Sequence, residues 1–457
     1  MKTLRKFLYL MVFLFFVLPA QAQEAPLPAK ISYQQYLEQV LVYYPSLKKE
    51  QANIEKAIAQ KALAGASRLP HLWLSAQYNY GNDPVYVFGA LLRQNKFTND
   101  DLALGRLNKP DAYSDNSAGV GGEWLLFDFA QTSSRVKSAG LLAESASFQG
   151  ELTRMEAILA ASEIYSRLAV TQQFLELIKG MAAAAKDDIA SAESLSRQGL
   201  ALGADFYTAR IYQTRLEQLF NETTAQHAAL SMVFNVLRGA DPSLAVEVAL
   251  DLKKPLVSPG TVQEWIAKTS EGRLDIKVLN KILEAQDTQQ DSEKKSFLPK
   301  IVAFGRADDH QHSIGEDGRT TYVAGLAAKM DIFDPSYASR VKIAQEEVNR
   351  LKAQTQELKD QSAKDTAEMY YRLHALSSNA VLADRMYNDS QEAVRLMQPL
   401  YREGRANIFQ MIGARLSQVE AYERWLKIEA ERRQSLLTLT FYAGELNERQ
   451  AEAIYGE

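Results

Sequence analysis

The sequence contains no cysteine, which restricts how the chain can be stabilised. Without thiols it has no disulfide, no thiolate metal site and no lipid-modified N-terminal cysteine, so its stability must come from packing. It also lacks any stripe of basic residues, because 52 lysines and arginines are scattered among 56 acids and leave a net charge of -4. We therefore set aside a role in binding nucleic acid.

Long hydrophobic runs are also scarce. The clearest one, residues 7–17, follows a basic start and precedes Ala20-Gln21-Ala22. This order is typical of a secretory signal peptide, so we predict that residues 1–22 are a signal peptide and that the mature chain is exported. No second run is long enough to suggest a helix across the inner membrane.

Catalytic motifs are missing as well. The chain has no G-x-S-x-G, Walker loop or H-E-x-x-H pattern, so we predict that it is not an enzyme and uses no cofactor. One cluster, His310-Gln311-His312 behind Asp308 and Asp309, has the donor types of a transition-metal site. Such a run is more often the solvated tip of a surface hairpin, and we predict no metal site.

What the sequence does contain is an internal repeat. Residues 134–239 and 339–444 align without a gap at an offset of 205. Upstream, residues 32–35 match residues 261–264 at an offset of 229, so the first copy carries a longer variable segment. The expected organisation is a first structural repeat at 23–250, a linker at 251–260, a second repeat at 261–446 and a C-terminal tail at 447–457.

Each repeat is expected to contain a long helical hairpin. Proline is absent from residues 131–198, where apolar or small residues recur at spacings of three and four. The pattern predicts a helix of roughly 65 to 70 residues, about 100 Å long, and the second copy repeats it with a weaker seam. Gly199 and Gly404 mark the expected tip turns. The returning helices are expected at about 205–237 and 409–442.

Between the helices, alternation of apolar and polar residues after Pro70 is typical of β-strands. The returning strands start near Ala118 in the first copy and near 322 in the second, and we assign Glu123, Lys329 and Asp331 to a lumen face. Such strands fit a transmembrane β-barrel, and the alternative is a soluble hairpin packed on one face. Four strands leave two unpaired edges, which lipid does not tolerate, so a barrel would close between chains.

Two segments fit this pattern less well. Arg306 interrupts the apolar Val302 and Phe304 in the outgoing strand of the second copy. Residues 81–116 are predicted to form a loop on the side opposite the helices. Within this loop, residues 85–92 are apolar enough to fold back over the mouth of a pore.

Several short motifs occur twice, in the same order: Tyr44-Pro45-Ser46-Leu47 and Arg273-Leu274-Asp275-Ile276, Leu69-Pro70 and Leu298-Pro299, Phe127-Asp128 and Phe333-Asp334, and the Arg-x-Gly tips. With these motifs the chain resembles the TolC family of outer-membrane efflux and secretion channels over essentially its whole mature length. The resemblance implies a mainly α fold with a membrane β part. Duplicated long antiparallel helical hairpins would form a trimeric α-barrel, and four strands per chain would contribute to a twelve-stranded transmembrane β-barrel.

The resemblance also implies partners and a gate. The expected partners are two further copies of the chain (a homotrimer), outer-membrane lipid, a periplasmic adaptor (membrane fusion) protein and an inner-membrane pump of the ABC or RND type. In that family a tyrosine on one hairpin bonds to an aspartate on the other, and Tyr401 and Asp205 match these positions. Arg405 lies one position before the matching basic residue. Gln410 and Gly413 replace the acids of the family's best-known members, so a carboxylate ring is not expected.

Tyr401 and Asp205 also fit simpler local roles. Tyr401 could be an exposed turn aromatic, and Asp205 a helix N-terminal acid. The predicted function is an outer-membrane channel-tunnel that exports small molecules or proteins through a gated trimeric pore, within a tripartite efflux or type I secretion system. The alternative is a periplasmic coiled-coil adaptor, although one helical hairpin would suffice for that role and the two β-hairpins would stay unexplained.

Overall fold

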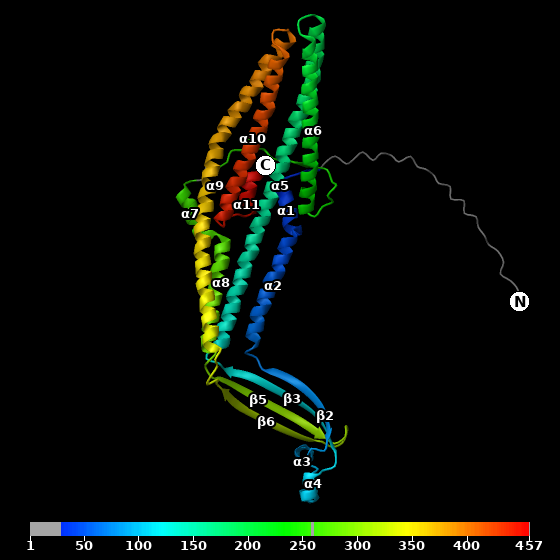
Figure 1. Cartoon of the computed structure of the whole chain (residues 1–457), viewed down its shortest axis with the longest axis vertical. Helices are drawn as coiled ribbons and strands as arrows, with labels where there is room; N and C mark the ends of the chain where they lie inside the picture. The colour runs from blue at the N-terminus through cyan, green and yellow to red at the C-terminus, as the bar shows by residue number, and fades with distance from the viewer. Residues whose placement is uncertain (1–28, 257–259, 457) are drawn as a thin grey trace, which may run out of the picture.

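The computed structural model describes residues 29–256 and 260–456, so the predicted signal peptide lies outside the described residues. The described chain is mainly helical and elongated, with a four-stranded sheet at one end and two helical tips at the other (Figure 1). The helices are α1 (Tyr33–Tyr43), α2 (Pro45–Ala66), α3 (Pro84–Arg93), the 3-10 helix η1 (Asn99–Leu102), α4 (Leu104–Asn108), α5 (Gln131–Arg197), α6 (Gly203–Leu237), α7 (Val262–Gly272), α8 (Leu274–Lys295), α9 (Tyr337–Arg402), α10 (Ile408–Tyr442) and α11 (Glu448–Tyr455). The strands are β1 (Ala29–Ile31), β2 (His71–Gly81), β3 (Tyr113–Phe127), β4 (Val246–Val248), β5 (Lys300–Gln311) and β6 (Arg319–Lys329).

The same succession of helices occurs twice along the chain. Helices α1 and α7 have 11 residues each, α2 and α8 have 22, and α6 and α10 have 35. Both α1 and α7 begin with a capping box, Ser32 with Gln35 and Thr261 with Glu264, which satisfies free backbone N–H groups at the helix start. Pro45 then begins α2, because proline fits the first turn of a helix but not its interior.

The prediction of long helices is confirmed by α5 and α9, which have 67 and 66 residues. Helix α5 packs against α2 and α8 and also against α6 and α10. Most of its predicted seam is buried, and Leu168 and Ile178 are 0% exposed. Thr171, the polar exception in the seam, is buried too, and its hydroxyl donates to the carbonyl oxygen of Arg167 at 2.8 Å.

The sheet at the other end is antiparallel, in the order β2-β3-β5-β6, and its register separates two faces. The apolar face carries Leu72, Leu74, Tyr78, Val120, Trp124, Ala307, Tyr322 and Leu326. The polar face carries Gln77, Asn79, Asp115, Glu123, Arg306, Asp308, His310, Arg319 and Lys329. Near the hairpin end the apolar face also becomes polar, with Asn116, Asp309 and Gln311.

Several details of the strands differ from the prediction. Strand β3 begins at Tyr113 rather than near Ala118, because its polar first residues still pair with β2. The connecting segment is therefore residues 82–112, and it contains α3, η1 and α4. Arg306 does share one face with Val302 and Phe304, but that face also carries Glu123 and Asp308 and is the polar one. Asp331 lies beyond the end of β6 and is not part of the strand in which we expected it.

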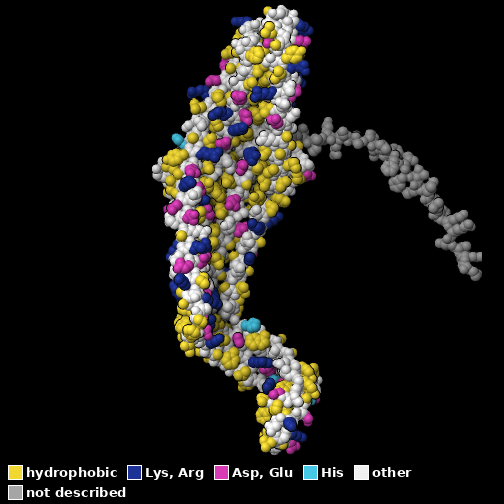
Figure 2. All heavy atoms as spheres, in the orientation of Figure 1, with side chains coloured by type: hydrophobic (Ala, Val, Ile, Leu, Met, Phe, Trp, Pro, Cys, Tyr) yellow, Lys and Arg dark blue, Asp and Glu magenta, His cyan; other side chains and the backbone are white. Residues whose placement is uncertain are grey.

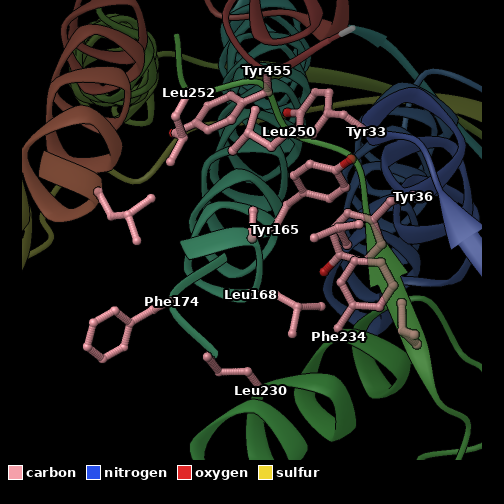
Figure 3. Packing of buried hydrophobic residues seen from close by; sticks show 14 of the residues in the cluster. Tyr33, Tyr36, Tyr165, Leu168, Phe174, Leu230, Phe234, Leu250, Leu252 and Tyr455 are labelled. Carbon is pink, nitrogen blue, oxygen red and sulfur yellow. The ribbon is translucent and has the colours of Figure 1, made fainter. Parts of the chain in front are cut away.

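The main hydrophobic core lies near the middle of the molecule, where α1, α5, α6 and α11 meet β1 and β4 (Figure 3). The rings of Tyr36 and Phe234 stack with centroids 3.8 Å apart, and the hydroxyls of Tyr33 and Ser162 are 2.6 Å apart. The segment expected as a C-terminal tail contains α11, and its Tyr455 is 0% exposed. The C-terminal segment is thus part of the core.

The segment expected as a linker is also fixed to the helices over its described part. Arg433 of α10 is 0% exposed and donates to the carbonyl oxygens of Leu252 and Lys254 at 2.9 and 2.7 Å. Burial lowers the pKa of Arg433, and the ion pair with Glu429 at 2.7 Å opposes this shift. A buried arginine that is paired and bonded in this way ties the connection between the two repeats to the second repeat.

Along the helices, charged side chains of both signs are interspersed on the face that Figure 2 shows. Among the described residues, no helix is both long enough and apolar enough to cross a membrane.

Candidate functional site

The tips of the two long hairpins hold the residues that sequence analysis selected as a gate. Gly199 and Gly404 lie in the turns and have φ angles of +74° and +71°, a left-handed conformation that glycine adopts at little cost. In the two turns, the N–H of Leu200 donates to the carbonyl of Leu195 and the N–H of Arg405 to that of Leu400, both at 2.9 Å. The two hairpins therefore reverse direction with the same local geometry.

Tyr401 lies inside the tip rather than on its surface. Its side chain is 2% exposed, and its hydroxyl donates to the backbone oxygen of Asp188 at 3.2 Å. Burial, together with the nearby carboxylates of Asp188 and Asp205, raises the pKa of Tyr401 to about 12. The hydroxyl thus keeps its proton at neutral pH and remains a hydrogen-bond donor.

The other two candidates make local contacts within the chain. The carboxylate of Asp205 accepts a hydrogen bond from the N–H of Leu202 at 3.3 Å, which caps the start of α6. The Tyr401 hydroxyl thus bonds across the hairpins to a backbone oxygen, whereas the sequence had suggested the Asp205 side chain. Arg405 is exposed and pairs with Glu403 at 3.2 Å, an ion pair of the kind that contributes little to stability.

A buried ion pair that sequence analysis missed lies beside Tyr401. Arg415 of α10 donates through Nε and a terminal nitrogen to the two carboxylate oxygens of Asp188 on α5, at 2.6 and 3.1 Å. Both side chains are buried, with 4% of Arg415 and 5% of Asp188 exposed. A two-pronged arginine–carboxylate contact of this kind fixes both distance and orientation, so it locks the first hairpin to the second.

The sequence indicated only one of the two residues of this pair. Arg415 aligns with Arg210 in the repeat, 205 positions earlier, and is one of the matching positions of the two copies. Its partner is 227 residues away, and the position that aligns with Asp188 in the second copy is Ala393. Arg210 and Ala393 are both exposed in the chain, and alanine carries no carboxylate, so the repeat does not reproduce this ion pair at the equivalent positions.

A fourth buried side chain, Tyr212 of α6, completes what we call the tip cluster: Asp188, Tyr212, Tyr401 and Arg415. Tyr212 is 3% exposed, and its hydroxyl has no hydrogen-bond partner within the described chain. Burial raises the pKa of Tyr212 to about 12, although the nearby Arg415 opposes this shift. The cluster joins α5, α6, α9 and α10, which are all four helices of the tip.

The positions of the absent acidic ring have structural roles of their own. Gln410 is the third residue of α10, where it forms a capping box with Asn407 at 3.0 Å. Gly413 leaves open space beside its backbone. Neither position supplies a carboxylate to the tip.

The polar face of the sheet is the second group of candidate residues. Glu123 and Lys329 do share this face, whereas Asp331 lies outside the strand. His310 lies 3.1 Å from the carboxylate of Asp115, and within the described residues no group of three or more possible ligand side chains could hold a metal ion.

Comparisons with known proteins find one family model and several similar folds. A family model described as "Outer membrane efflux protein" matches residues 36–232 and 265–445. The fold is similar to that of a membrane protein from Pseudomonas aeruginosa, at 19% identity over 90% of this chain and 92% of that chain, with a TM-score of 0.77. It is also similar to the outer membrane protein VceC from Vibrio cholerae (16% identity, 90% and 96% covered, TM-score 0.73) and to the outer membrane channel CmeC from Campylobacter jejuni (13%, 95% and 93%, 0.76). No curated protein matches the chain.

Proposed function

The chain belongs to the outer membrane efflux protein family, and on that premise we propose that three copies assemble into one gated conduit. The protein is an outer-membrane efflux channel with a periplasmic helical part. In the proposed trimer, three sheets of four strands close one twelve-stranded barrel. Helices α5, α6, α9 and α10 of each chain continue that barrel as a tunnel.

The observation that carries this proposal is the pair of open sheet edges. Within the described chain, β2 and β6 each pair on one side only, so a row of backbone N–H and C=O groups is left free on each outer edge. In lipid such groups cost several kcal/mol each unless they are paired. Closure with neighbouring copies satisfies them, with the apolar face towards lipid and the polar face towards the lumen.

The alternative function, a periplasmic adaptor, is not favoured. The family match spans both repeats, and the four-stranded sheet with one apolar face has no role in a helical adaptor. An adaptor and an inner-membrane pump are instead proposed as partners that meet the channel at its hairpin tips. The cargo would then pass from the pump through the tunnel without any chemistry in the channel itself.

For the gate we propose that the junction within one chain stays closed while the junctions between chains open. The Asp188–Arg415 lock joins the two hairpins of a single chain. By the repeat, the equivalent junction between neighbouring chains would bring together Arg210 and Ala393, which cannot form the same ion pair. Each chain would therefore move as one unit when the tip opens.

The proposal is tested by the behaviour of the purified protein in detergent. The native chain is expected to need detergent, to migrate as a three-chain species on a gel without heating, and to conduct ions in planar bilayers. Boiling should convert it to a single-chain band, as expected when a barrel unfolds. A stable monomer that stays in solution without detergent would show that the assignment is wrong.

A further inference from the structure

The segment between β2 and β3 folds onto the polar face of the sheet. Tyr86 at the start of α3 donates through its hydroxyl to the backbone oxygens of Asn79 and Tyr113, at 2.9 and 3.3 Å. The N-terminal end of α3 is thereby attached to both strands of the first hairpin. In Figure 1, α3 lies beside the end of the sheet that is farthest from the helical tips.

The other end of α3 is held by a buried polar network. Gln94, which caps the helix, donates to the carboxylate of Asp115 at 2.9 Å and to the backbone oxygen of Ser114 at 3.0 Å. On its other side Asp115 lies 3.1 Å from His310 of β5. Gln94, Asp115 and His310 are 4%, 1% and 5% exposed. Because Asp115 and His310 belong to the polar face, α3 must lie on the lumen side of the proposed barrel wall.

Contacts with the second hairpin reinforce this position. Just beyond α3, Lys96 pairs with Glu316 at 3.5 Å and Asn95 accepts a hydrogen bond from Arg319 at 3.1 Å. These residues follow α3 directly, so the helix is tied to both hairpins of the sheet. Exposed pairs contribute little energy, but here they add to the buried network in fixing one orientation.

The side of α3 that points away from the wall is apolar. Val87, Ala90 and Gln94 lie on the wall side, and the first two are 5% and 1% exposed. The set Val85, Phe88 and Leu92 has the same spacing but is displaced by two residues, about 200° around a helix with 3.6 residues per turn. Their exposures are 80%, 38% and 46%; the Phe88 ring packs edge-on against Phe97, with centroids 4.9 Å apart, and keeps part of its surface uncovered.

We propose that these three side chains meet those of two further copies of the chain and form an apolar constriction at the outer mouth of the pore. This inference rests on the proposed trimer, because one chain encloses no lumen. A constriction of this kind favours amphipathic or apolar organic molecules as the cargo. An apolar constriction excludes water and therefore hinders ions, which would have to give up their hydration, whereas an apolar solute gains free energy when it leaves water for an apolar surface.

The absence of native cysteine allows a direct accessibility test in whole cells. The reporter is Ser75→Cys, on the polar face below α3, and the two reagents are a charged trimethylammonium methanethiosulfonate and uncharged methyl methanethiosulfonate, both added from outside. In the otherwise native chain the charged reagent is expected to react roughly tenfold more slowly than the uncharged one. With Val85→Ser, Phe88→Ser and Leu92→Ser together, the two rates should become similar.

Two controls separate the possible failures. Leu104→Ser on α4 removes an apolar side chain that is 77% exposed on the same segment, and it should leave the difference between the reagents intact. Val85→Cys alone should yield disulfide-linked chains under mild oxidation, which keeps the inference testable if the triple variant fails to assemble. Equal rates in the native trimer, or no linked chains from Val85→Cys in a trimer, would overturn the constriction. Loss of the trimer itself in the native chain would overturn the proposed function.

Discussion

At the scale of single residues, the tip combines one well-paired buried charge with one unpaired buried hydroxyl. Asp188 and Arg415 satisfy each other through two contacts, whereas the hydroxyl of Tyr212 beside them finds no partner within the described chain. Breaking a buried pair leaves an uncompensated charge, and an unpaired hydroxyl already carries a desolvation cost. The two features therefore predict opposite responses to mutation.

Removing one partner of the lock should weaken the tip strongly. For Arg415→Ala we expect a loss of about 3–5 kcal/mol in the free energy of unfolding, together with a higher single-channel conductance. Arg395→Ala, in an exposed pair on α9, is the matched control and should change little. If Arg415→Ala matched this control in both denaturant unfolding and bilayer conductance, the pair would have no locking role.

Changing Tyr212 to Phe should instead raise the free energy of unfolding, and it should also alter how this free energy depends on pH. The pKa of Tyr212 is about 12 in the folded chain and about 10 in an unfolded one, so above pH 10 the unfolded state loses its proton first. The free energy of unfolding therefore falls as pH rises from about 10 to about 12. In Tyr212→Phe this contribution is absent. Unfolding curves measured from pH 8 upwards should show that the stability of the variant declines less steeply with pH and is not reduced at pH 8. A marked loss of stability at pH 8 would indicate that the hydroxyl has a hydrogen-bond partner after all.

At the scale of elements, the long helices were largely predictable because each carries several agreeing signals, whereas α3, η1, α4 and α11 lie in segments that we expected to be a loop and a tail. The long helix predicted from residue 131 ends at Arg197, and the returning helices begin at Gly203 and Ile408, within two residues of the expected positions. The strands were less predictable. The first residues of β3, from Tyr113 to Ser117, show no clear alternation of apolar and polar residues. Asp115 among them is buried, where Gln94 and His310 provide its hydrogen-bond partners. The partner of Arg415 could not be predicted, because no local pattern marks a contact 227 residues away.

Glycines at element ends allow a matched comparison. Gly199 and Gly444 both have positive φ, +74° and +67°. A Cβ at Gly199 would meet open space, so Gly199→Ala should cost about 1–2 kcal/mol from backbone strain alone. A Cβ at Gly444 would overlap the carbonyl oxygen of Gly272 at the end of α7, and Gly444→Ala should destabilise the chain clearly more. Equal melting temperatures for the two variants would contradict this packing of α7 against α10.

At the scale of the whole molecule, the chain alone leaves both ends incomplete. The sheet has two open edges, and the tip has a locked junction on one side and the unlocked residues Arg210 and Ala393 on the other. Both features are accounted for by neighbouring copies of the same chain. In the proposed trimer, three copies related by rotation would pair every edge and leave no strand open, as closed symmetry requires.

The most direct test of this account asks whether β6 of one chain pairs with β2 of the next. Ser75→Cys on β2 is combined in turn with single cysteines at each position from Tyr322 to Leu326 on β6, in a chain that otherwise has none. These two strands lie on opposite edges of the sheet, so a disulfide between them must join two chains. The account predicts linked species of up to three chains, with the highest yields at alternate positions along β6. Absence of linked chains at every position, with the protein monomeric in detergent, would contradict it.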